Sequence, residues 1–486
     1  MQRRQFLSRT GATLSVPTLL VANGAHAATT NESSATSLEQ RLADFTLAVH
    51  YDTLPAVVVT AVKRIVLDTL ACAFGAVGSE AATIAETTIR STFGTGQVAT
   101  VIGHSRSATV EGAVFVNGVL VRSLDLNDTY LGTEPLHRSE LLPTALALCE
   151  EGKRSGRDFI AALVAGYEAS MRITDAVSFI ERGFHPLCSM AYGAPLIAGR
   201  LWGLKQPAIA HAVGLSAARG YTSFVVNSGA ISMMKAMGFA ASAVDAIFAT
   251  RLAANGFTGP TGTLEWFASR ATPSKAPVTV DLDPENYRMP KVAFKRYPIQ
   301  IELAAVAEAG SVLSTNLRGR IAEIQSIAVE TYPGIIARVA DADKFRPQTR
   351  GTADHSLPVC LAMALLDGDV TLGQFEKDRW RDSDVMGLVG KTKVSTNPAL
   401  MAKIPKGLGA SVEVTFSDGT SLRETVEVPE GDSQRPLSRA SLERKFRTAA
   451  VPVVGDAAAK RIVLLVDALE TLPDLGQLAR ALRRGA

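Results

Sequence analysis

The segment from Arg122 to Ser139 carries carboxylates, hydroxyl groups, an imidazole and two guanidinium groups within eighteen residues. Carboxylates and imidazoles can accept or deliver a proton, and arginine can hold an anionic substrate. The segment therefore predicts one wall of an active site. A solvated loop between two helices is the alternative, because polar clusters that contain glycine and proline usually mark loops. The side chains concerned are Arg122, Asp125, Asp128, Thr129, Glu134, His137, Arg138 and Ser139.

The composition is that of a large globular protein. The 486 residues are 47% hydrophobic and 20% charged, which allows a large core and argues against disorder. The formal net charge is +3, and Arg3, Arg4 and Arg9 in the first 27 residues account for this excess. The remainder is close to neutral, so the charge balance does not indicate a nucleic-acid partner.

The first 27 residues resemble a twin-arginine export signal. The pair Arg3-Arg4 precedes a mostly apolar, lysine-free stretch from Gly11 to Val21, and Ala25-His-Ala27 places small residues where a signal peptidase cleaves. We therefore expect residues 1–27 to be removed and the mature protein to work in the periplasm. An ordinary first helix is the alternative, which Pro17 disfavours.

The sequence motifs indicate neither a metal nor a cofactor. Cys72, Cys149, Cys188 and Cys360 lie far apart, without a Cys-x-x-Cys spacing or a paired histidine, which argues against zinc and iron–sulfur clusters. We expect them to be small core residues. The chain has neither a phosphate-binding Gly-Lys-Ser/Thr loop nor a Gly-x-Gly-x-x-Gly motif after a strand. Beyond the signal, no stretch reaches about 18 uninterrupted apolar residues, so no membrane span is expected.

Apolar residues recur with helical spacing from Leu38 to about Ala271. Pro55 is typical of a helix start, and the apolar stripe that follows it falls at i, i+4, i+7 and i+8, so one face of this helix should be buried. The members of the stripe are Val58, Val62, Ile65 and Val66. Helical spacing returns near the C-terminus, so both ends of the chain are predicted to be helical. The second stripe consists of Ile462, Leu465, Val466 and Leu469.

Between these ends the pattern indicates β-strands. Residues 271–277 indicate a linker, and Asp418-Gly419 between two alternating runs predicts a hairpin. We therefore predict a mainly α fold with a smaller α+β domain. Its helical domain comprises residues 38–277 and 431–486, and residues 278–430 form an inserted α+β lid. Ligands usually bind in the cleft between two such domains.

Several segments carry a resemblance to a known family. The longest is Arg122-x-Leu-Asp-x-Asn-Asp-Thr-Tyr-Leu131, followed by Glu134 and His137-x-Ser139. The others are Leu67–Cys72, Ala113–Gly118 as a turn, Gly256–Pro260 and Thr349–Pro358. Together they resemble the MmgE/PrpD family, which includes 2-methylcitrate dehydratase, cis-aconitate decarboxylase and an iminodisuccinate epimerase. The resemblance spans roughly residues 60 to 380 and agrees with a helical domain and a lid.

The resemblance implies a cofactor-independent lyase that acts on a di- or tricarboxylic acid. As in 2-methylcitrate dehydratase, the reaction would be proton abstraction next to a carboxylate and loss of water. A homodimer is implied as well. The implied catalytic residues are Asp125, Thr129, His137, His185 and Lys235. The residues expected to bind substrate are Arg122, Lys295, Arg350 and His355.

We expect Asp125 and His137 to work as a proton-handling pair. Simpler roles are open for three of these residues: Asp125 could brace its loop, His185 could cap a helix, and Lys235 could be a surface amine. The chain also departs from the family, because Gln300 and Val359 stand where relatives often carry histidine and tyrosine. An isomerase, an epimerase or a cis-aconitate-type decarboxylase therefore remains an alternative, as does a periplasmic binding protein without catalysis.

Overall fold

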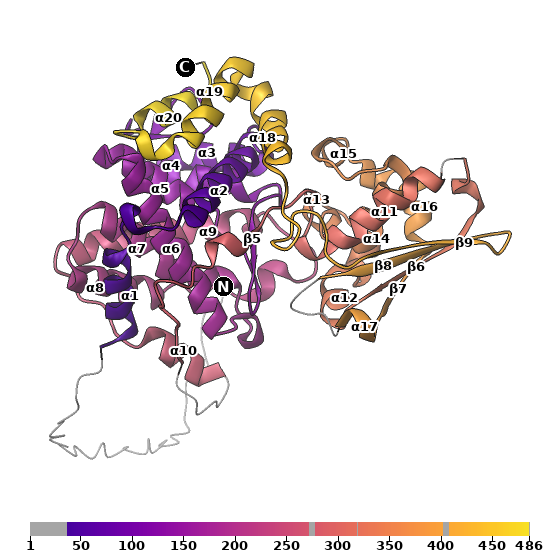
Figure 1. Ribbon diagram of the computed structural model, residues 1–486, viewed down its shortest axis with the longest axis horizontal. Helices are drawn as coiled ribbons and strands as arrows, with labels where there is room; N and C mark the ends of the chain where they lie inside the picture. Colours follow the sequence, from indigo (N-terminus) through magenta and orange to yellow (C-terminus); the bar gives the residue numbers. More distant parts are fainter. Residues whose placement is uncertain (1–35, 272–277, 318, 402–407, 486) are drawn as a thin grey trace, which may run out of the picture. The chain divides into compact units, whose positions relative to one another are not determined.

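The computed structural model describes residues 36–271, 278–317, 319–401 and 408–485. The predicted export signal and residues 272–277 of the predicted linker lie outside these ranges. The described chain is mainly helical with small sheets, which confirms the predicted fold class (Figure 1). From Ser37 onward the chain packs as one compact unit, so the boundaries proposed at residues 278 and 431 stay a prediction.

Helices fill the chain up to Ala271. Helix α2 (Ala56–Gly75) begins directly after Pro55, and all four residues of its predicted stripe are buried, which confirms that prediction. The other helices of this part are α1 (Leu38–Ala48), α3 (Glu80–Phe93), α4 (Val110–Arg122), α5 (Leu141–Gly152), α6 (Gly156–Ala176), α7 (Met190–Leu201), α8 (Gln206–Ala217), α9 (Met234–Ala254) and α10 (Thr263–Ala271).

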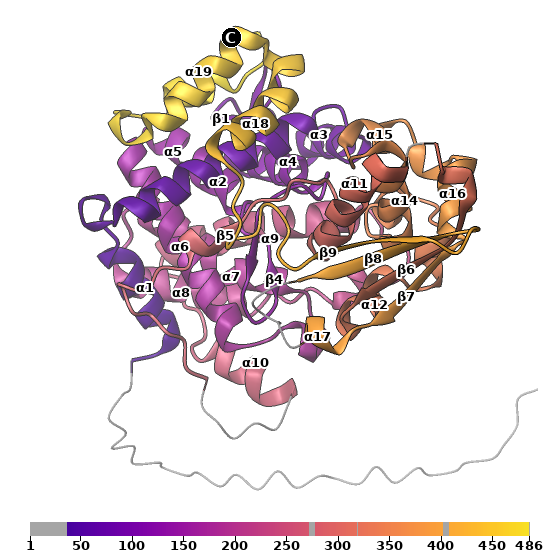
Figure 2. The same cartoon turned by 45° about the vertical axis from the view of Figure 1, so that its right-hand side comes forward.

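The two ends of the chain share one hydrophobic core. Helices α18 (Arg439–Val454), α19 (Asp456–Asp467) and α20 (Gly476–Ala481) follow the middle segment, and α18 lies against α2 (Figures 1 and 2). The rings of Phe74 and Phe446 meet edge to face at this contact, with their centroids 6.0 Å apart. The same cluster of buried side chains includes Phe294, so the start of the middle segment packs into the helical part.

A three-stranded sheet occupies part of the segment from Arg122 to Ser139, for which a solvated loop was the alternative prediction. Its strands β3 (Thr129–Leu131), β4 (Pro135–Leu136) and β5 (Val292–Ala293) are ordered β4-β3-β5 and are antiparallel. The pairing of Thr129 with Ala293 brings the chain around residue 295 close to the chemically dense segment. A further short pair consists of β1 (Ala99–Thr100) and β2 (Ser107–Ala108).

A second hydrophobic cluster lies between Tyr297 and Val426. It surrounds a four-stranded sheet of order β7-β6-β8-β9, in which only the β6–β7 pair is parallel. The turn at Asp418-Gly419 joins β8 to β9, as predicted. The strands are β6 (Ile324–Thr331), β7 (Thr392–Thr396), β8 (Ala410–Phe416) and β9 (Ser421–Val426). Helices α11 (Ala304–Leu317) and α14 (Leu357–Asp367) lie on one face of the sheet (Figures 1 and 2). The remaining helices are α12 (Pro333–Val339), α13 (Arg350–Ala353), α15 (Leu372–Glu376), α16 (Ser383–Val389) and α17 (Pro398–Met401).

The prediction of a turn at Ala113–Gly118 is wrong, because these residues lie inside α4. Gly118 is needed there for a close helix contact rather than for a turn. A Cβ atom at Gly118 would lie 2.8 Å from the Cβ of Ala240 on α9. Small residues on both helices therefore allow α4 and α9 to approach closely.

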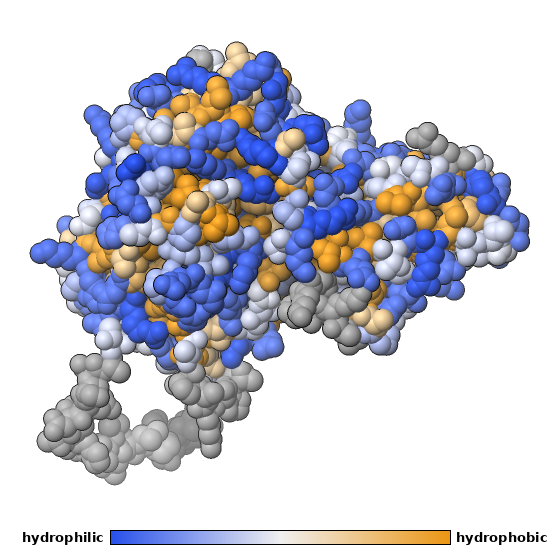
Figure 3. Space-filling view, viewed as in Figure 1, coloured by the Kyte–Doolittle hydropathy of each residue, from blue (hydrophilic) through white to orange (hydrophobic). Residues whose placement is uncertain are grey.

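Helix α9 is long and apolar enough to cross a membrane by length and composition alone. In the described chain, 56% of its apolar window is buried, and core helices of globular proteins pass the same test, so this is weak evidence for a span. On the face drawn in Figure 3, apolar side chains are interspersed with hydrophilic ones.

The four cysteines are buried and unpaired, as expected for core residues.

Candidate active site

The carboxylate of Asp125 is the centre of a buried cluster of cations. One oxygen, Oδ1, pairs with Nη1 of Arg122 and lies 3.3 Å from Nζ of Lys235. The other oxygen lies 3.3 Å from Nζ of Lys295. Asp125 is 2% exposed, so these charges interact with little screening by solvent.

Four separate segments bring the cluster together. Arg122 is the last residue of α4, and Asp125 follows in a left-handed turn with φ of 50°. Asp tolerates this conformation better than most residues. Lys235 lies in the first turn of α9, and Lys295 comes shortly after β5. Because β5 pairs with β3, Lys295 reaches back to the Asp125 backbone and donates to its carbonyl oxygen at 2.8 Å.

His355 completes the cluster from the turn between α13 and α14. Its Nδ1 lies 2.5 Å from the carboxylate of Asp354. Its Nε2 is in hydrogen-bond contact with Nζ of Lys235 and lies 3.7 Å from Oδ2 of Asp125. The contact with the carboxylate of Asp354 places the proton of the neutral ring on Nδ1 and leaves Nε2 as the acceptor.

His137 lies near this cluster but is held by other groups. Its Nδ1 lies 2.6 Å from the backbone carbonyl of Asp128 and 3.2 Å from Oγ1 of Thr129. The Nε2 atom forms no hydrogen bond with a described residue. Likewise, no hydrogen bond among the described residues joins His137 to Asp125. The expected proton-handling pair is therefore not formed, because Asp125 is bound by cations and His137 by a backbone carbonyl.

His185 has the capping role that the sequence left open. Its Nδ1 accepts a hydrogen bond from the backbone N–H of Leu187 at 3.0 Å, at the start of the 3₁₀ helix Pro186–Ser189. The side-chain amide of Asn227 lies 2.9 Å from Nε2. Burial, followed by the charges of Arg122 and Lys235, lowers the pKa of His185 to about 3. The ring is therefore neutral at ordinary pH, and both of its nitrogens already have hydrogen-bond partners.

Six of the nine predicted site residues line one small cavity, in which water can occupy a volume of about 60 Å³. The 3₁₀ helix Ile301–Leu303, the residue before it and α12 contribute further residues to the same wall. The six predicted residues are Arg122, Asp125, His137, His185, Lys235 and His355. These further residues are Gln300, Ile301, Glu302 and Arg338.

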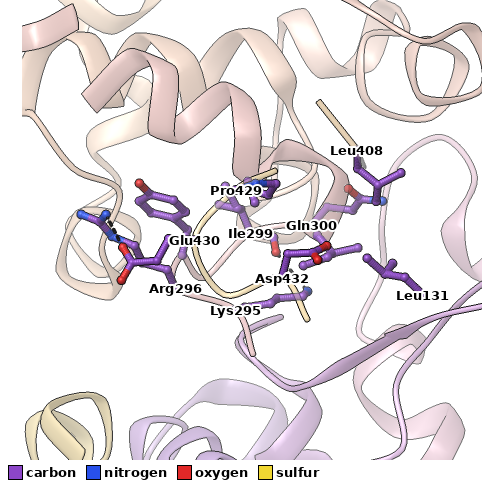
Figure 4. A pocket seen from close by; sticks show the side chains of 12 residues that line it. Leu131, Lys295, Arg296, Ile299, Gln300, Leu408, Pro429, Glu430 and Asp432 are labelled. Atoms are coloured by element: carbon purple, nitrogen blue, oxygen red, sulfur yellow. Dashed lines mark hydrogen bonds and ion pairs between the residues drawn. The ribbon is translucent and has the colours of Figure 1, made fainter. Parts of the chain in front are cut away.

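The other three predicted residues lie outside this lining. Lys295 lines a narrow neighbouring cavity. Figure 4 shows the ion pair of Arg296 and Glu430 at one end of this cavity, and the side chains of Leu131 and Leu408 at the other end. Arg350 lines a larger cavity of about 620 Å³, which shares Arg122, Asp125 and Lys235 with the small one. Thr129 is buried behind His137 and contacts its ring.

Several polar residues of the segment from 122 to 139 hold the local fold instead of lining the cavity. Asp128 accepts hydrogen bonds from the backbone N–H of Arg138 and Ser139 and from the hydroxyl of Tyr167. Glu134 binds the hydroxyl of Ser178 and two backbone N–H groups after it. The active-site wall is therefore narrower than predicted.

Burial and charge set the protonation states in the cluster. Burial alone would raise the pKa of Asp125, but the charges of Lys235, Lys295 and Arg122 hold it well below its usual value. Burial lowers the pKa of Lys235 to about 8, although Asp125 opposes this shift. Burial, then Arg122 and Lys295, lowers the pKa of His137 well below its usual value. The cavity thus combines a permanent carboxylate, cations and neutral imidazoles.

Asp125, Asp354 and His355 each offer one metal-ligand atom, and these atoms lie within 4.8 Å of one another. The surroundings do not fit a metal ion, however. Each oxygen of Asp125 already faces an ammonium group, and Nε2 of His355 contacts Lys235. A divalent cation in this position would be repelled by both lysines.

The sequence alone did not identify three residues of the site. The motif Thr349–Pro358 includes Asp354, but the sequence does not indicate that this residue orients His355. Glu302 and Arg338 were not among the predicted site residues, yet both line the cavity. The family motif around residue 354 was the one signal that pointed to Asp354.

Comparison with known proteins supports the likeness seen in the sequence. The chain is 25% identical to cis-aconitate decarboxylase of Homo sapiens over 453 residues, which cover 87% of this chain and 89% of that protein. It is 27% identical to a cis-aconitate decarboxylase-like protein of Aspergillus oryzae, over 87% of this chain and 93% of that protein. With 2-methylcitrate dehydratase of Escherichia coli K12 the identity is 25%, over 66% of this chain and 71% of that enzyme.

Two family models account for most of the chain. The MmgE/PrpD N-terminal domain matches residues 40–268, which include Arg122, Asp125 and Lys235 of the buried cluster. Lys295 and His355 lie outside this range. The MmgE/PrpD C-terminal domain matches residues 297–471, which include His355, Gln300, Glu302 and Arg338 of the cavity. Dehydratases and decarboxylases are both among the similar proteins. The chain therefore belongs to the MmgE/PrpD family.

Proposed function

We propose that this protein is a cofactor-independent lyase that acts on a small di- or tricarboxylic acid. The observation that carries the proposal is the buried cluster of Arg122, Lys235 and Lys295 around Asp125, next to neutral histidines in one cavity. A hydrogen next to a carboxylate is a weak acid, so its removal requires a positioned base and cations that stabilise the enolate-like charge. The cavity contains both.

In this proposal, Lys235 binds the carboxylate next to the reacting carbon. It is the one cation of the cluster that also touches a histidine of the same cavity. The negative charge that develops on that carboxylate during proton removal is stabilised by Lys235 and Arg122. Asp125 stays ionised and holds the cations in place.

Two histidines are available for proton transfer. His137 lines the cavity and has Nε2 free of partners among the described residues, so it accepts the proton from carbon. His355 shares a hydrogen-bonded proton with Lys235 and is backed by Asp354. As hydroxide leaves and the enolate-like charge is lost, His355 can relay the proton that it shares with Lys235 to the leaving group, so Lys235 stays charged for as long as that negative charge exists.

Dehydration of a 2-methylcitrate-like hydroxy acid is the first candidate reaction. The electron pair of the broken C–H bond forms the double bond, and the leaving hydroxide takes a proton from His355. Decarboxylation of a cis-aconitate-like acid is the second candidate. There the C–C bond to the departing carbon dioxide breaks, and its electron pair takes a proton at carbon. The second candidate is supported by the longer coverage of the decarboxylases, 87% of this chain against 66% for the dehydratase of Escherichia coli K12.

The test is to incubate the purified protein with 2-methylcitrate, citrate or cis-aconitate in deuterium oxide and to follow the products by NMR. Water loss gives an alkene, decarboxylation gives carbon dioxide and a dicarboxylate, and isomerisation or epimerisation gives deuterium incorporation without loss of mass. Loss of water or of carbon dioxide that disappears in His137→Gln supports the proposal, whereas deuterium incorporation alone would favour the isomerase or epimerase. Binding of the acids without deuterium uptake or turnover would instead favour a periplasmic binding protein.

We also propose that the mature protein is a periplasmic homodimer. The support is the sequence of residues 1–27, in which Arg3-Arg4 precedes an apolar stretch, together with the family resemblance. No nucleic-acid or membrane partner is proposed for the mature chain. Sedimentation of the exported protein tests the oligomeric state.

A further inference from the structure

The lid side of the cavity contains an ion pair that has no assigned role. Arg338 on α12 donates through Nε to Oε2 of Glu302 at 3.2 Å, and through Nη2 to Oε1. The forked contact uses one edge of the guanidinium group. Both residues line the cavity that contains Lys235 and His137.

Glu302 is held rigidly in this contact. It is 4% exposed, and its carboxylate also accepts a hydrogen bond from the hydroxyl of Tyr332 at 3.0 Å. The side-chain amide of Gln300 donates to Oε2, and its carbonyl oxygen accepts from the backbone N–H of Glu302 at 2.7 Å. With these partners the Glu302 carboxylate is saturated, so it is not available to a ligand.

Arg338, by contrast, has unused hydrogen-bonding capacity. Its side chain is 33% exposed, whereas that of Glu302 is 3% exposed. The Nη1 group forms no hydrogen bond with any residue that the structure describes. Glu302 therefore orients Arg338 by one edge and leaves N–H groups of the guanidinium open. Such an arrangement suits a carboxylate, which can accept two parallel hydrogen bonds.

We propose that Arg338 is a specificity-determining residue that binds a second carboxylate of the substrate, and that Glu302 is its positioning residue. The inference rests on the proposed function, in which Lys235 binds the first carboxylate. A dicarboxylate would then span the cavity between Lys235 on the helical side and Arg338 on the lid. A monocarboxylate would leave Arg338 without its anion and should bind more weakly.

The test uses the purified full chain and measures binding by calorimetry. The probes are malonate, succinate and glutarate, each compared with the monocarboxylate of the same length. We expect at least one dicarboxylate to bind 10- to 100-fold more tightly than its monocarboxylate, the range for loss of a charge-assisted hydrogen bond. Arg338→Met should abolish this preference and leave monocarboxylate binding unchanged. The matched control is Arg346→Met, because Arg346 is exposed and does not line the cavity.

Removing Arg338 alone leaves the buried Glu302 carboxylate unpaired, which could unfold the lid. The double variant Glu302→Gln with Arg338→Met avoids this charge and should show the same loss of preference. The inference is overturned if the wild type shows no preference for dicarboxylates, or if either variant keeps it. It is also overturned if Arg338→Met weakens both classes of acid equally, as a purely structural pair would.

This binding test separates the inference from the proposed function. Preference for dicarboxylates without turnover of any acid would reject the lyase and keep the role of Arg338. Turnover together with an unchanged preference for dicarboxylates in Arg338→Met would reject the role of Arg338 and keep the lyase. Glu302→Gln adds a kinetic check: as a positioning change it should raise KM for a dicarboxylate substrate by more than it lowers kcat.

Discussion

Oδ1 of Asp125 lies 3.3 Å from Nζ of Lys235, and this pair joins the turn after α4 to the start of α9. The same carboxylate pairs with Arg122 and Lys295. Asp125 is therefore both the electrostatic centre of the candidate site and a contact that holds three segments together, which are the end of α4 with its turn, the start of α9 and the chain after β5. Its substitution should affect stability as well as activity.

We expect Asp125→Asn to lower the free energy of unfolding by about 3 to 5 kcal/mol, because it leaves buried cations without their anion. Urea denaturation followed by circular dichroism measures the change. The control is Asp52→Asn, which breaks an exposed ion pair with Arg157. The side chain of Asp52 is 80% exposed and that of Arg157 is 54% exposed. That change should cost less than about 1 kcal/mol. Equal effects of the two substitutions would contradict a structural role for Asp125.

The second prediction concerns pH. Burial lowers the pKa of Lys235 to about 8, so its ammonium group is present below this pH and is lost above it. If Lys235 binds a substrate carboxylate, kcat/KM should fall above about pH 8 by up to tenfold per pH unit. In Lys235→Arg the charge persists at high pH, so any remaining activity should not show this fall. An unchanged profile in that variant would assign the titration to another group.

The contribution of Lys235 to stability should change with pH in the direction opposite to kcat/KM, because it rises above about pH 8 where kcat/KM falls. The folded-state pKa of Lys235 lies below its ordinary value of 10.5. Between these two values the unfolded chain binds more protons than the folded one, so the contribution of Lys235 to stability increases as pH rises from about 8 towards 10.5. Below about pH 8 both states are protonated, and this contribution is constant.

The third prediction tests His137. Its Nε2 is free of partners in the described chain, and its Nδ1 contacts a backbone carbonyl. His137→Gln should therefore reduce kcat by roughly 10² to 10⁴, the range for general acid–base residues, and change stability by no more than about 1 kcal/mol. His50→Gln is the control, because His50 is exposed. Clear destabilisation with nearly intact turnover would make His137 a scaffold residue.

The helical part of the fold was predictable because helix spacing is a local property of the sequence. The stripe from Val58 to Val66 predicts the buried face of α2 without knowledge of its partners. The sheet of β3, β4 and β5 was not predictable, since its strands have only two or three residues and show no periodicity. It depends on a pairing between Thr129 and Ala293, which are far apart in the chain.

The site was predictable only as far as residue types and motifs reach. Motifs identified Lys235 and His355, which the structure brings into contact. The spacing of Asp125 and His137 did not reveal that they have different partners, because spacing along a loop does not fix side-chain direction. Arg338 lies in the plain sequence Ile-Ile-Ala-Arg-Val, and its pairing with Glu302 arises from tertiary packing.

A fourth prediction concerns export. Because Arg3-Arg4 begins the predicted twin-arginine signal, Arg3→Lys together with Arg4→Lys should prevent export and leave the chain in the cytoplasm. Wild-type protein should be recovered from the periplasm without about its first 27 residues, as determined by mass spectrometry. The control is the Arg9→Lys variant, which should be exported normally because Arg9 lies outside the arginine pair. Recovery of an intact N-terminus in the cytoplasm of wild-type cells would reject the idea.

The last prediction concerns metal dependence. Asp125, Asp354 and His355 could form a metal site by donor type and distance, but Lys235 and Lys295 each lie 3.3 Å from the Asp125 carboxylate. Two unit charges at 4 Å interact by about 4 kcal/mol at the effective dielectric constant near a protein surface, and a divalent ion doubles this repulsion. Activity should therefore survive EDTA treatment and should not increase when Zn²⁺, Mg²⁺ or Mn²⁺ is added. Loss of activity that one specific metal restores would show that an ion displaces the lysines from Asp125, and would require a Lewis-acid role in place of the cation cluster.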